Sequence, residues 1–377
     1  MSGAVLRRLE AYVFRYPVAT PVQTSFSVMH DRPAVFIRLE DADGCQGWGE
    51  AWCNFPSVGA EHRARLVTNV LGPMVIGHIL DDPTELFNYL TQMTAVLALQ
   101  AGEYGPLAQA IAAIDLAAWD IAAKRAGEPL WRLLGGTSPE IGVYASGINP
   151  TQPERTASIK LAEGHRAFKL KIGFGTERDK QNLAAVRAVV GDAHLAADAN
   201  QVWSLRDARA ILAQIEPFHL AWLEEPLRRD RPWHEWLELA NAGAPPLAAG
   251  ENLAGEAEFS AALAAGVLAV VQPDIAKWGG FSGCLPLARS IQRAGKRFCP
   301  HFLGGGIGLV ASAHLLAAAG GNGLLEIDAN ENPLRDLIAG SQMMVTEGRV
   351  SLSDSPGLGI EPDFARIKAY RVTNINL

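Results

Sequence analysis

Three carboxylic acids lie at the ends of three successive apolar segments of the sequence. Asp198 belongs to LAADAN, Glu224 to AWLEEP and Glu251 to LAAGEN. Three carboxylates that converge on one point cannot all stay ionised unless a cation shares the site. Oxygen ligands favour Mg²⁺ or a similar hard cation, and a set poor in histidine disfavours zinc. Single acids at such positions commonly cap helices, but three in register indicate a metal site.

Two lysines, Lys169 and Lys171, alternate with apolar residues in AFKLKIGFG. Residues two apart in a strand point to the same side, so both ammonium groups would face the carboxylates and the metal. A lysine desolvated near a cation and another lysine has its neutral form favoured, as a general base requires. A snorkelling pair on an edge strand is the alternative. The flanking Phe168, Leu170 and Ile172 argue against it, because they indicate a strand covered on its other face.

An acid and a histidine follow the next strand-like segments. Asp274 lies in VVQPDIAKWGG and His301 in RFCPHFLGGG. A carboxylate hydrogen-bonded to an imidazole fixes its tautomer and supports proton transfer. We therefore expect these two residues to act as a pair, although a lone histidine is more often structural.

Three further ionisable residues have weaker claims to the site. Lys277 follows Asp274 by three positions, and we expect it at most behind the residues that touch the substrate. His314 lies inside the helical pattern SAHLLAAA and is expected to be structural. Glu326, in LLEID, could donate a hydrogen bond to a developing oxyanion if it is protonated; otherwise it is a loop or helix-capping acid.

The spacing of these residues indicates how the chain positions them. From Lys171 to Glu326, one ionisable residue recurs every 23 to 27 positions. From about Val143, strand-like pieces alternate with helical patterns such as Asp179–Val190 and Leu205–Ile215, which is typical of βαβ units and a parallel sheet. Eight such pieces favour an α/β fold of the (β/α)8 or TIM-barrel type, in which all strand ends meet at one mouth. The eight pieces are VYASG, FKLKIG, LAADAN, LAWLEEP, LAAGEN, AVVQPD, RFCPHF and LLEID.

The rest of the chain is expected to form a cap over this barrel. We expect an α+β capping domain over residues 1–136, the barrel over 137–339, and a tail over 340–377 that returns to the capping domain. Strands are expected at Leu9–Arg15 and Ala34–Glu40, and a long helix at Leu107–Lys124. The loops around Thr24–His30 and Trp52–Phe55 would cover the barrel mouth and exclude water, unless they are ordinary solvent loops. Their candidate substrate contacts are Thr24, Phe26 and Trp52.

The composition excludes several classes of protein. The chain has 377 residues, 49% of them hydrophobic and 19% charged, and a net charge of −7. That charge and the lack of a basic stripe argue against nucleic acid as a partner. We expect no signal peptide and no membrane span, and the four scattered cysteines favour reduced thiols in the cytoplasm. Neither GFG nor GGGIG has the spacing and context of a dinucleotide-binding loop, so a nicotinamide oxidoreductase is a poor fit.

The ordered motifs resemble the enolase superfamily, and within it the mandelate racemase subgroup. They are KLK, DAN, EEP, GEN, PD followed by GG, PH and LE, with the closing stretch PGLGIEPD. The resemblance covers nearly the whole chain and implies the same barrel and cap. The muconate-lactonising and dipeptide-epimerase subgroup carries a lysine where this chain has Asp274, so that subgroup is disfavoured.

The resemblance also implies a role for each motif residue. Lys171 is expected to be a base on one face of the substrate, and Lys169 to neutralise the substrate carboxylate. The Asp274–His301 pair would serve the opposite face. The remaining expectations are Asp198, Glu224 and Glu251 as ligands of Mg²⁺, Glu326 as a hydrogen-bonding partner of the intermediate, and Asn200 as a substrate contact.

These roles imply Mg²⁺-dependent removal of the proton α to a carboxylate, through an enediolate. The leading hypothesis is dehydration of an acid sugar to a 2-keto-3-deoxy acid. The alternative is a racemase or epimerase of a 2-hydroxy acid, and the sequence does not separate the two. A non-catalytic scaffold that keeps a metal site is a remote third. The partner is therefore expected to be a small carboxylate, and the resemblance implies a homo-oligomer.

Overall fold

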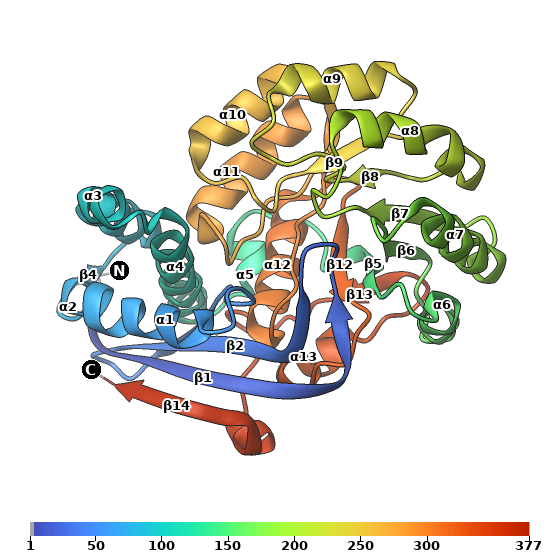
Figure 1. The fold of residues 1–377 in the computed structure, drawn as a ribbon. Coiled ribbons are helices and arrows are strands. Elements are labelled where there is room, and N and C mark those ends of the chain that lie inside the picture. The colour runs from blue at the N-terminus through green and yellow to red at the C-terminus, as the bar shows by residue number, and fades with distance from the viewer. Residues whose placement is uncertain (1–3, 377) are drawn as a thin grey trace.

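The N-terminal part of the chain forms an antiparallel sheet with helices packed on it (Figure 1). The computed structural model describes residues 4–376. The expected strands Leu9–Arg15 and Ala34–Glu40 lie inside two longer strands that pair with each other. The hydrogen-bonded order is β14–β1–β2–β3, and β4 pairs with the beginning of β1. The strands are β1 (Ala4–Gln23), β2 (Val28–Asp41), β3 (Gln46–Ala51), β4 (Ile79–Leu80) and β14 (Arg371–Asn376).

The capping helices begin and end where their sequences favour it. Helix α3 starts after Asp82, whose side chain accepts a hydrogen bond from Thr84 N (2.8 Å), and ends at Gly102 in the left-handed conformation. Helix α4 packs closely on β3 because two strand positions lack a side chain. A Cβ at Gly47 would lie 2.0 Å from the carbonyl oxygen of Ala117. The helices are α1 (Gly59–Arg65), which continues as a π-helical stretch, α2 (Gly72–Val75), α3 (Pro83–Ala101) and α4 (Tyr104–Ala126).

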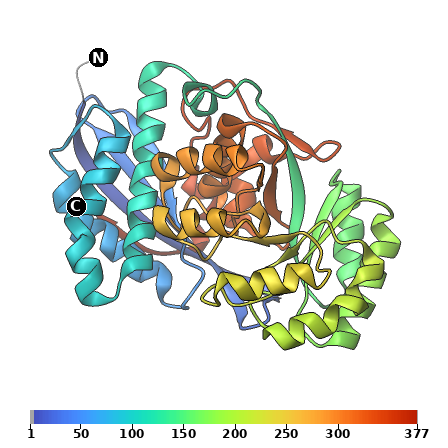
Figure 2. The same cartoon turned by 90° about the horizontal axis from the view of Figure 1, so that it is seen from above.

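Helix α4 corrects the expectation that no apolar run could span a membrane. It is 23 residues long, and its most apolar 18-residue window has a mean hydropathy of 1.2, so it is long and apolar enough by length and composition. However, 78% of its most apolar window is buried inside the protein. Such burial is typical of a core helix. In Figure 2, the blue and cyan capping part lies beside the orange helices of the second unit.

The second part confirms the expected (β/α)8 barrel with its cap. Eight strands follow the order β11–β10–β9–β8–β7–β6–β5–β12, and all neighbours in this series are parallel. Across the remaining gap, Leu324 N donates to Cys299 Sγ at 3.4 Å. The strands are β5 (Glu140–Ile148), β6 (Ala167–Lys171), β7 (His194–Asp198), β8 (Leu223–Glu224), β9 (Leu247–Ala249), β10 (Leu268–Val271), β11 (Arg297–Phe298) and β12 (Leu324–Asp328).

Helices connect these strands on the outside of the barrel. The expected helix Leu205–Ile215 is α8, with both bounds as predicted, and it starts at Ser204, whose hydroxyl accepts from Asp207 N. The helices are α5 (Leu130–Leu133), α6 (Pro153–Ala162), α7 (Thr176–Val190), α8 (Leu205–Ile215), α9 (Trp233–Asn241), α10 (Gly255–Ala265), α11 (Gly280–Arg293), α12 (Gly306–Ala319) and α13 (Pro333–Ala339).

The barrel interior explains why polar residues gather at one end. A buried cluster fills the barrel below the mouth, and it includes Tyr144, Trp222 and Cys299. Alternate residues of a strand face the same side, so the residues two positions further along also face the axis. Those residues are Ser146, Lys169, Asp198, Glu224, Gln272 and His301.

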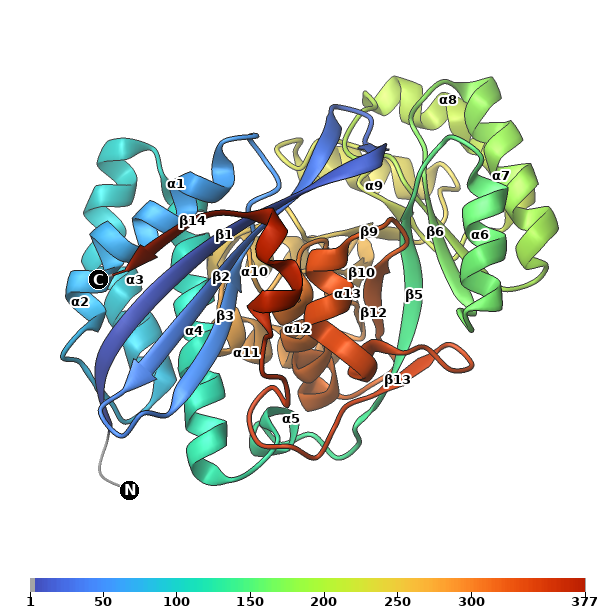
Figure 3. The same ribbon diagram turned by 90° about the horizontal axis from the view of Figure 1, so that it is seen from below.

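The tail contacts both parts of the protein. Strand β13 (Arg349–Ser351) pairs antiparallel with β5 of the barrel, and β14 pairs with β1 of the capping sheet. Figure 3 shows β14 alongside β1 and β13 alongside β5. The tail was expected to return to the capping domain as a unit; in the structure, β14 lies there and β13 extends a barrel strand.

His314 lies in the structural position that the sequence predicts. It is fully buried on α12, its Nδ1 accepts from Trp131 N (3.0 Å), and its Nε2 faces the carbonyl oxygen of Leu358 (3.2 Å). If Nδ1 were protonated it could no longer accept this hydrogen bond, and two N–H donors would face each other. Burial lowers the pKa of His314 to about 4. Between pH 4 and 6.5 the folded protein therefore binds fewer protons than the unfolded chain, and stability falls as the pH falls.

We predict that His314→Asn removes part of this acid sensitivity. Asparagine can still accept from Trp131 N but does not titrate. The loss of unfolding free energy between pH 7 and pH 5 should be about 2 kcal/mol smaller in the variant than in the wild type. Urea unfolding at both pH values measures it, with the exposed His219→Asn as matched control. An equal loss in wild type and variant would contradict the prediction.

Candidate active site

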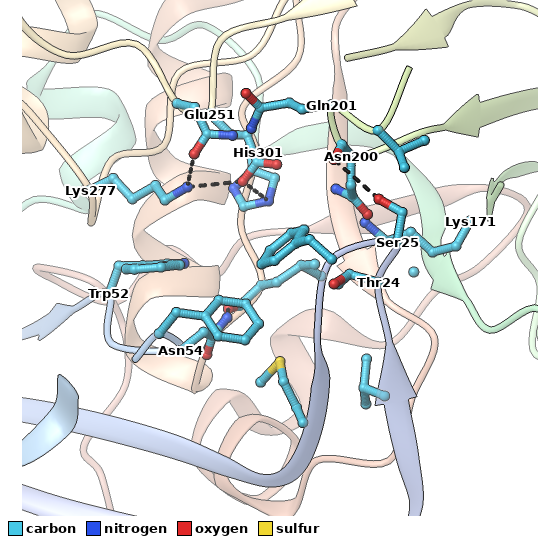
Figure 4. A pocket seen from close by; sticks show the side chains of 18 of the residues that line it. Thr24, Ser25, Trp52, Asn54, Lys171, Asn200, Gln201, Glu251, Lys277 and His301 are labelled. Atoms are coloured by element: carbon cyan, nitrogen blue, oxygen red, sulfur yellow. Dashed lines mark hydrogen bonds and ion pairs between the residues drawn. The ribbon is translucent and has the colours of Figure 1, made fainter. Parts of the chain in front are cut away.

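A cavity of about 510 Å³ lies where the barrel mouth meets the capping loops. From the barrel, Lys171, Asn200 and Glu251 reach it together with Lys277 and His301. Figure 4 shows Lys171 and Asn200 on one side of this cavity and Glu251 and Lys277 on the other. The capping residues Thr24, Phe26 and Trp52, expected to touch the substrate, also line it.

Each of the two strand lysines is paired with a carboxylate. Lys171 Nζ lies 2.6 Å from Asp198 Oδ2. Lys169 Nζ lies 2.7 Å from both oxygens of Glu224 and 2.7 Å from Glu326 Oε1. Both lysines are at most 4% exposed, so neither is a snorkelling surface residue. The carboxylates of the neighbouring strands thus offset the charge repulsion and the cost of burial.

The expectation of a neutral Lys171 concerns a site that also holds a cation, so this pairing leaves it a prediction. Burial lowers the pKa of Lys171, but the adjacent Asp198 outweighs it, so the pKa lies above its usual value. The same balance, with Glu224 as the main partner, raises the pKa of Lys169 well above its usual value. We expected the carboxylates on the opposite side of the site from the lysines. In the structure, Asp198 and Glu224 instead contact the two ammonium groups directly.

Asp274 and His301 form the expected pair. His301 Nδ1 lies 2.7 Å from Asp274 Oδ2, while Asp274 Oδ1 accepts from Ala276 N (2.8 Å) and Lys277 N (3.1 Å). The free His301 Nε2 lies 3.2 Å from Glu251 Oε2. Burial lowers the pKa of His301, but the surrounding carboxylates, first Glu251, raise it to about 9.

Lys277 lies at the cavity wall, where we had expected a residue behind the site at most. Its Nζ contacts Glu251 Oε2 and Asn252 Oδ1, both at 3.0 Å, and lies 4.5 Å from the ring centre of Trp52. Spacing along the sequence does not reveal this contact, because a turn after the strand end directs the side chain back into the mouth.

Glu326 is surrounded by donors in the structure, whereas the sequence suggested that it could itself donate a hydrogen bond if it is protonated. It accepts from Ser146 Oγ and from Phe302 N (2.9 Å) and forms an ion pair with Lys169. Burial raises its pKa, but Lys169 and then His301 outweigh burial and lower the pKa to about 2. In this arrangement Glu326 is an anion that holds Lys169 and the backbone beside His301.

Glu225 is a sixth acid at the site, which we did not predict from the sequence. It is 1% exposed, and both its oxygens accept from Asn252 Nδ2 (2.9 and 3.0 Å). Burial, then Glu251 and Asp198, raise its pKa well above the usual value. Its φ of +39° lies in the left-handed region, so the chain turns and two consecutive glutamates both face the site. The two consecutive glutamates of the EEP motif were the sequence feature that could have indicated this second acid.

The residues present suit a hard divalent cation. Within residues 4–376, no three His, Cys, Asp or Glu side chains already stand together as a metal-binding group. The mouth nevertheless crowds six carboxyl groups against three lysines and one histidine, and this crowding contributes to the raised pKa of Glu225. The oxygens Asn200 Oδ1 and Gln272 Oε1 are buried there without a partner. Oxygen donors of this kind are those that Mg²⁺ prefers, with Asp198, Glu224 and Glu251 as the residues that would hold it.

The capping domain fixes the loop that follows His301. Glu50, at 2% exposure, accepts at the N-terminus of α12 from Gly305 N and from Gly308 N (2.8 Å). Asn54 Nδ2 donates to the carbonyl oxygen of Leu303 (2.6 Å). A carboxylate at a helix N-terminus satisfies orphan N–H groups and complements the helix dipole.

A second buried carboxylate does the same for the helix that follows Asp274. Asp115, on α4, accepts at the N-terminus of α11 from Phe281 N (2.6 Å) and Ser282 N (3.2 Å). The cap therefore binds the starts of α11 and α12, which follow the strands carrying the Asp274–His301 pair.

Comparison with known proteins identifies related chains over nearly the full length. Residues 8–135 match the profile of the mandelate racemase / muconate lactonizing enzyme N-terminal domain, and residues 154–366 match the enolase C-terminal domain-like profile. The D-galactarolactone cycloisomerase of Agrobacterium fabrum is 30% identical over an alignment of 382 positions, which covers 97% of this chain and 98% of that protein.

Two further relatives connect sequence and structure. The L-talarate/galactarate dehydratase of Salmonella typhimurium is 31% identical over an alignment of 362 positions, which covers 91% of this chain and 85% of that protein. Its structure with Mg and L-lyxarohydroxamate superposes with a TM-score of 0.88, at 26% identity, over 100% of this chain and 95% of that chain. A mandelate racemase/muconate lactonizing enzyme from Bordetella bronchiseptica RB50 has 56% identity and a TM-score of 0.92, over 98% and 99% of the two chains.

We predict that Glu50→Gln loosens the junction between cap and barrel. The amide nitrogen of glutamine would face an N–H donor of α12, leaving a buried donor without an acceptor. The variant should lose about 1–3 kcal/mol of stability in urea unfolding. Measurement at pH 8 keeps the wild-type carboxylate ionised, since burial raises the pKa of Glu50 to about 7. Glu128→Gln, at an exposed position, is the control; equal stability of both variants would refute the role assigned to Glu50.

Proposed function

Because the chain belongs to the mandelate racemase/muconate lactonizing enzyme family of the enolase superfamily, we propose that it is a Mg²⁺-dependent acid-sugar dehydratase. The observation that carries this proposal is the meeting of Lys171 and His301 in one cavity beside three candidate metal ligands. Their strands, β6 and β11, are separated by four strands in the barrel order, so the two groups approach a substrate from different sides.

The proposed reaction removes water from a 2,3-dihydroxy acid. The Lys171 amine accepts the proton from C2, and the electron pair of that C–H bond enters an enediolate. The imidazolium of His301 gives its proton to the hydroxyl on C3, which leaves as water, and the resulting enol becomes a 2-keto-3-deoxy acid. When bound, Mg²⁺ supplies positive charge to the enediolate oxygens. Lys169, 1% exposed, would add a fixed cation beside the substrate carboxylate.

Lys171 must lose its proton before it can act as the base. In the structure, Asp198 Oδ2 binds both Lys171 Nζ (2.6 Å) and Asn200 Nδ2 (3.1 Å). A cation ligated by Asp198 would compete for that oxygen. His301 differs, because Asp274 holds its Nδ1 and leaves Nε2 directed into the site, as a proton donor requires.

A racemase or epimerase of a 2-hydroxy acid is the second candidate. Its support is the same pair of proton carriers, since His301 could return a proton to C2 in place of expelling a hydroxyl. A non-catalytic metal-binding scaffold would not require two such carriers and is the remote alternative. The acid sugars named for the relatives support a small carboxylate as the ligand. A homo-oligomer and a cytoplasmic location are further parts of this proposal.

We predict that Mg²⁺ binds at the three strand-end carboxylates. Calorimetry with MgCl₂ should detect binding to the wild type and a more than tenfold weaker affinity for Glu251→Gln, because an amide replaces an anionic ligand. Glu258→Gln, on the surface of α10, provides a control of the same chemistry. Unchanged affinity in Glu251→Gln would remove Glu251 from the ligand set.

We predict that the two proton carriers can be separated by substitution. Proton NMR in D₂O with Mg²⁺, over a panel of sugar acids and 2-hydroxy acids, should reveal a 2-keto-3-deoxy product from one of them. Lys171→Met should then lose turnover by at least 10²-fold, whereas His301→Asn should retain exchange at C2 and lose elimination.

Lys180→Met, on the outer helix α7, is the control for the loss of a lysine. Full turnover by Lys171→Met would show that another group is the base. Exchange at C2 without elimination in the wild type would instead favour the racemase.

A further inference from the structure

The cavity differs in character between its two ends. At the barrel end it presents ionisable and amide side chains, among them Lys171 and His301. At the capping end it presents five apolar side chains, Val22, Phe26, Met29, Trp52 and Phe55, beside the polar Thr24, Ser25, Arg32 and Asn54. The substrate carboxylate belongs at the barrel end, so the opposite end of the substrate meets the apolar side chains.

The polar side chains of the cap are already engaged. Ser25 Oγ donates to the carbonyl oxygen of Ala199 (2.9 Å), and Thr24 Oγ1 to that of Ser27 (3.0 Å). Asn54 Nδ2 donates to the carbonyl oxygen of Leu303 (2.6 Å). These bonds hold the capping loops in place and leave these donors committed to protein backbone.

Like Lys171, the other lysine and arginine side chains that line the cavity each have a carboxylate partner. Arg32 Nη2 lies 2.6 Å from Asp328 Oδ2, and both side chains are at most 2% exposed. Arg228 Nε lies 3.0 Å from Asp230 Oδ1 at the rim. Lys277 pairs with Glu251 (3.0 Å). A second carboxylate on the substrate would therefore be buried without a cation of its own, which is costly.

We propose that the substrate is a monocarboxylic acid whose distal end is uncharged and partly apolar, as in a 6-deoxyaldonic acid. This inference rests on the proposed function for the position of the carboxylate. It assigns specificity to the capping residues, with Phe26 as the most adaptable of them. Phe26 is 62% exposed and packs against Phe55 with the rings tilted and their centres 5.2 Å apart. A methyl group there gains apolar contact, whereas a carboxylate loses its hydration.

Matched acids test this inference. The ligands are sets of three acids with the same configuration at carbons 2 to 5: the 6-deoxyaldonate, the aldonate and the aldarate. Calorimetry in MgCl₂ measures the binding of each acid to the protein. Proton NMR in D₂O follows exchange and elimination in the same acids. For the configuration that binds best, the 6-deoxyaldonate should bind at least tenfold more tightly than the aldarate. Equal or tighter binding of the aldarate overturns the inference.

A charged substitution gives an independent check. Phe26→Arg adds a cation at an exposed position. It should reduce the ratio of 6-deoxyaldonate affinity to aldarate affinity at least fivefold. Ile159→Arg, 48% exposed on α6 at the outside of the barrel, should leave it unchanged. An unchanged preference in Phe26→Arg would remove Phe26 from the specificity surface.

The two proposals fail in different ways. Binding in the expected order without exchange or elimination would overturn the proposed function and support the inference about the ligand. Turnover with a preference for the aldarate would support the function and overturn the inference. Failure of every acid to bind would overturn both.

Discussion

The contact between lysines and carboxylates inside the barrel mouth is the interaction on which the site depends. Lys169 and Lys171 project from one short strand into the interior, where an unpaired ammonium group would be strongly destabilising. Asp198 and Glu224, at the ends of the next two strands, lie within 2.7 Å of them. Removal of one partner from such a buried pair typically costs about 3–5 kcal/mol. The same charges that make the site reactive therefore also hold the strand ends together.

The carboxyl groups in the mouth remain crowded after these pairs are formed. Lys277 and His301 contact Glu251, and Glu225 is left against two other acids. A divalent cation would relieve this repulsion. The capping domain contributes a different kind of order. Its buried carboxylates Glu50 and Asp115 bind helix starts, and this binding couples the cap to the strands that carry the Asp274–His301 pair.

Much of this arrangement could be predicted because a barrel repeats one unit. Each strand–helix repeat returns the chain to the same mouth, so regular spacing was enough to bring Asp198, Glu224 and His301 together. The helical pattern between two of the strand pieces likewise predicted α8 with both of its bounds.

The residues that escaped prediction depend on irregular backbone. Glu225 faces the site only because of its left-handed conformation, and Lys277 reaches the cavity from a turn. The direct contacts of Lys171 with Asp198 and of Glu326 with Lys169 were not predicted, because a sequence does not show which oppositely charged groups come into contact. The great length of β1 was also missed, since its second half has a weak alternation of polar and apolar residues.

The pairing of β14 with β1 has a consequence for how the chain is made. Glu10 to Phe14 find their hydrogen-bonding partners in residues 371–376, which follow the whole barrel in the chain. During translation, one edge of the capping sheet is therefore open until the barrel has emerged from the ribosome. Open edges pair readily with other chains. The nascent chain thus carries an aggregation-prone edge for most of its synthesis, and the final strand protects that edge only at the end.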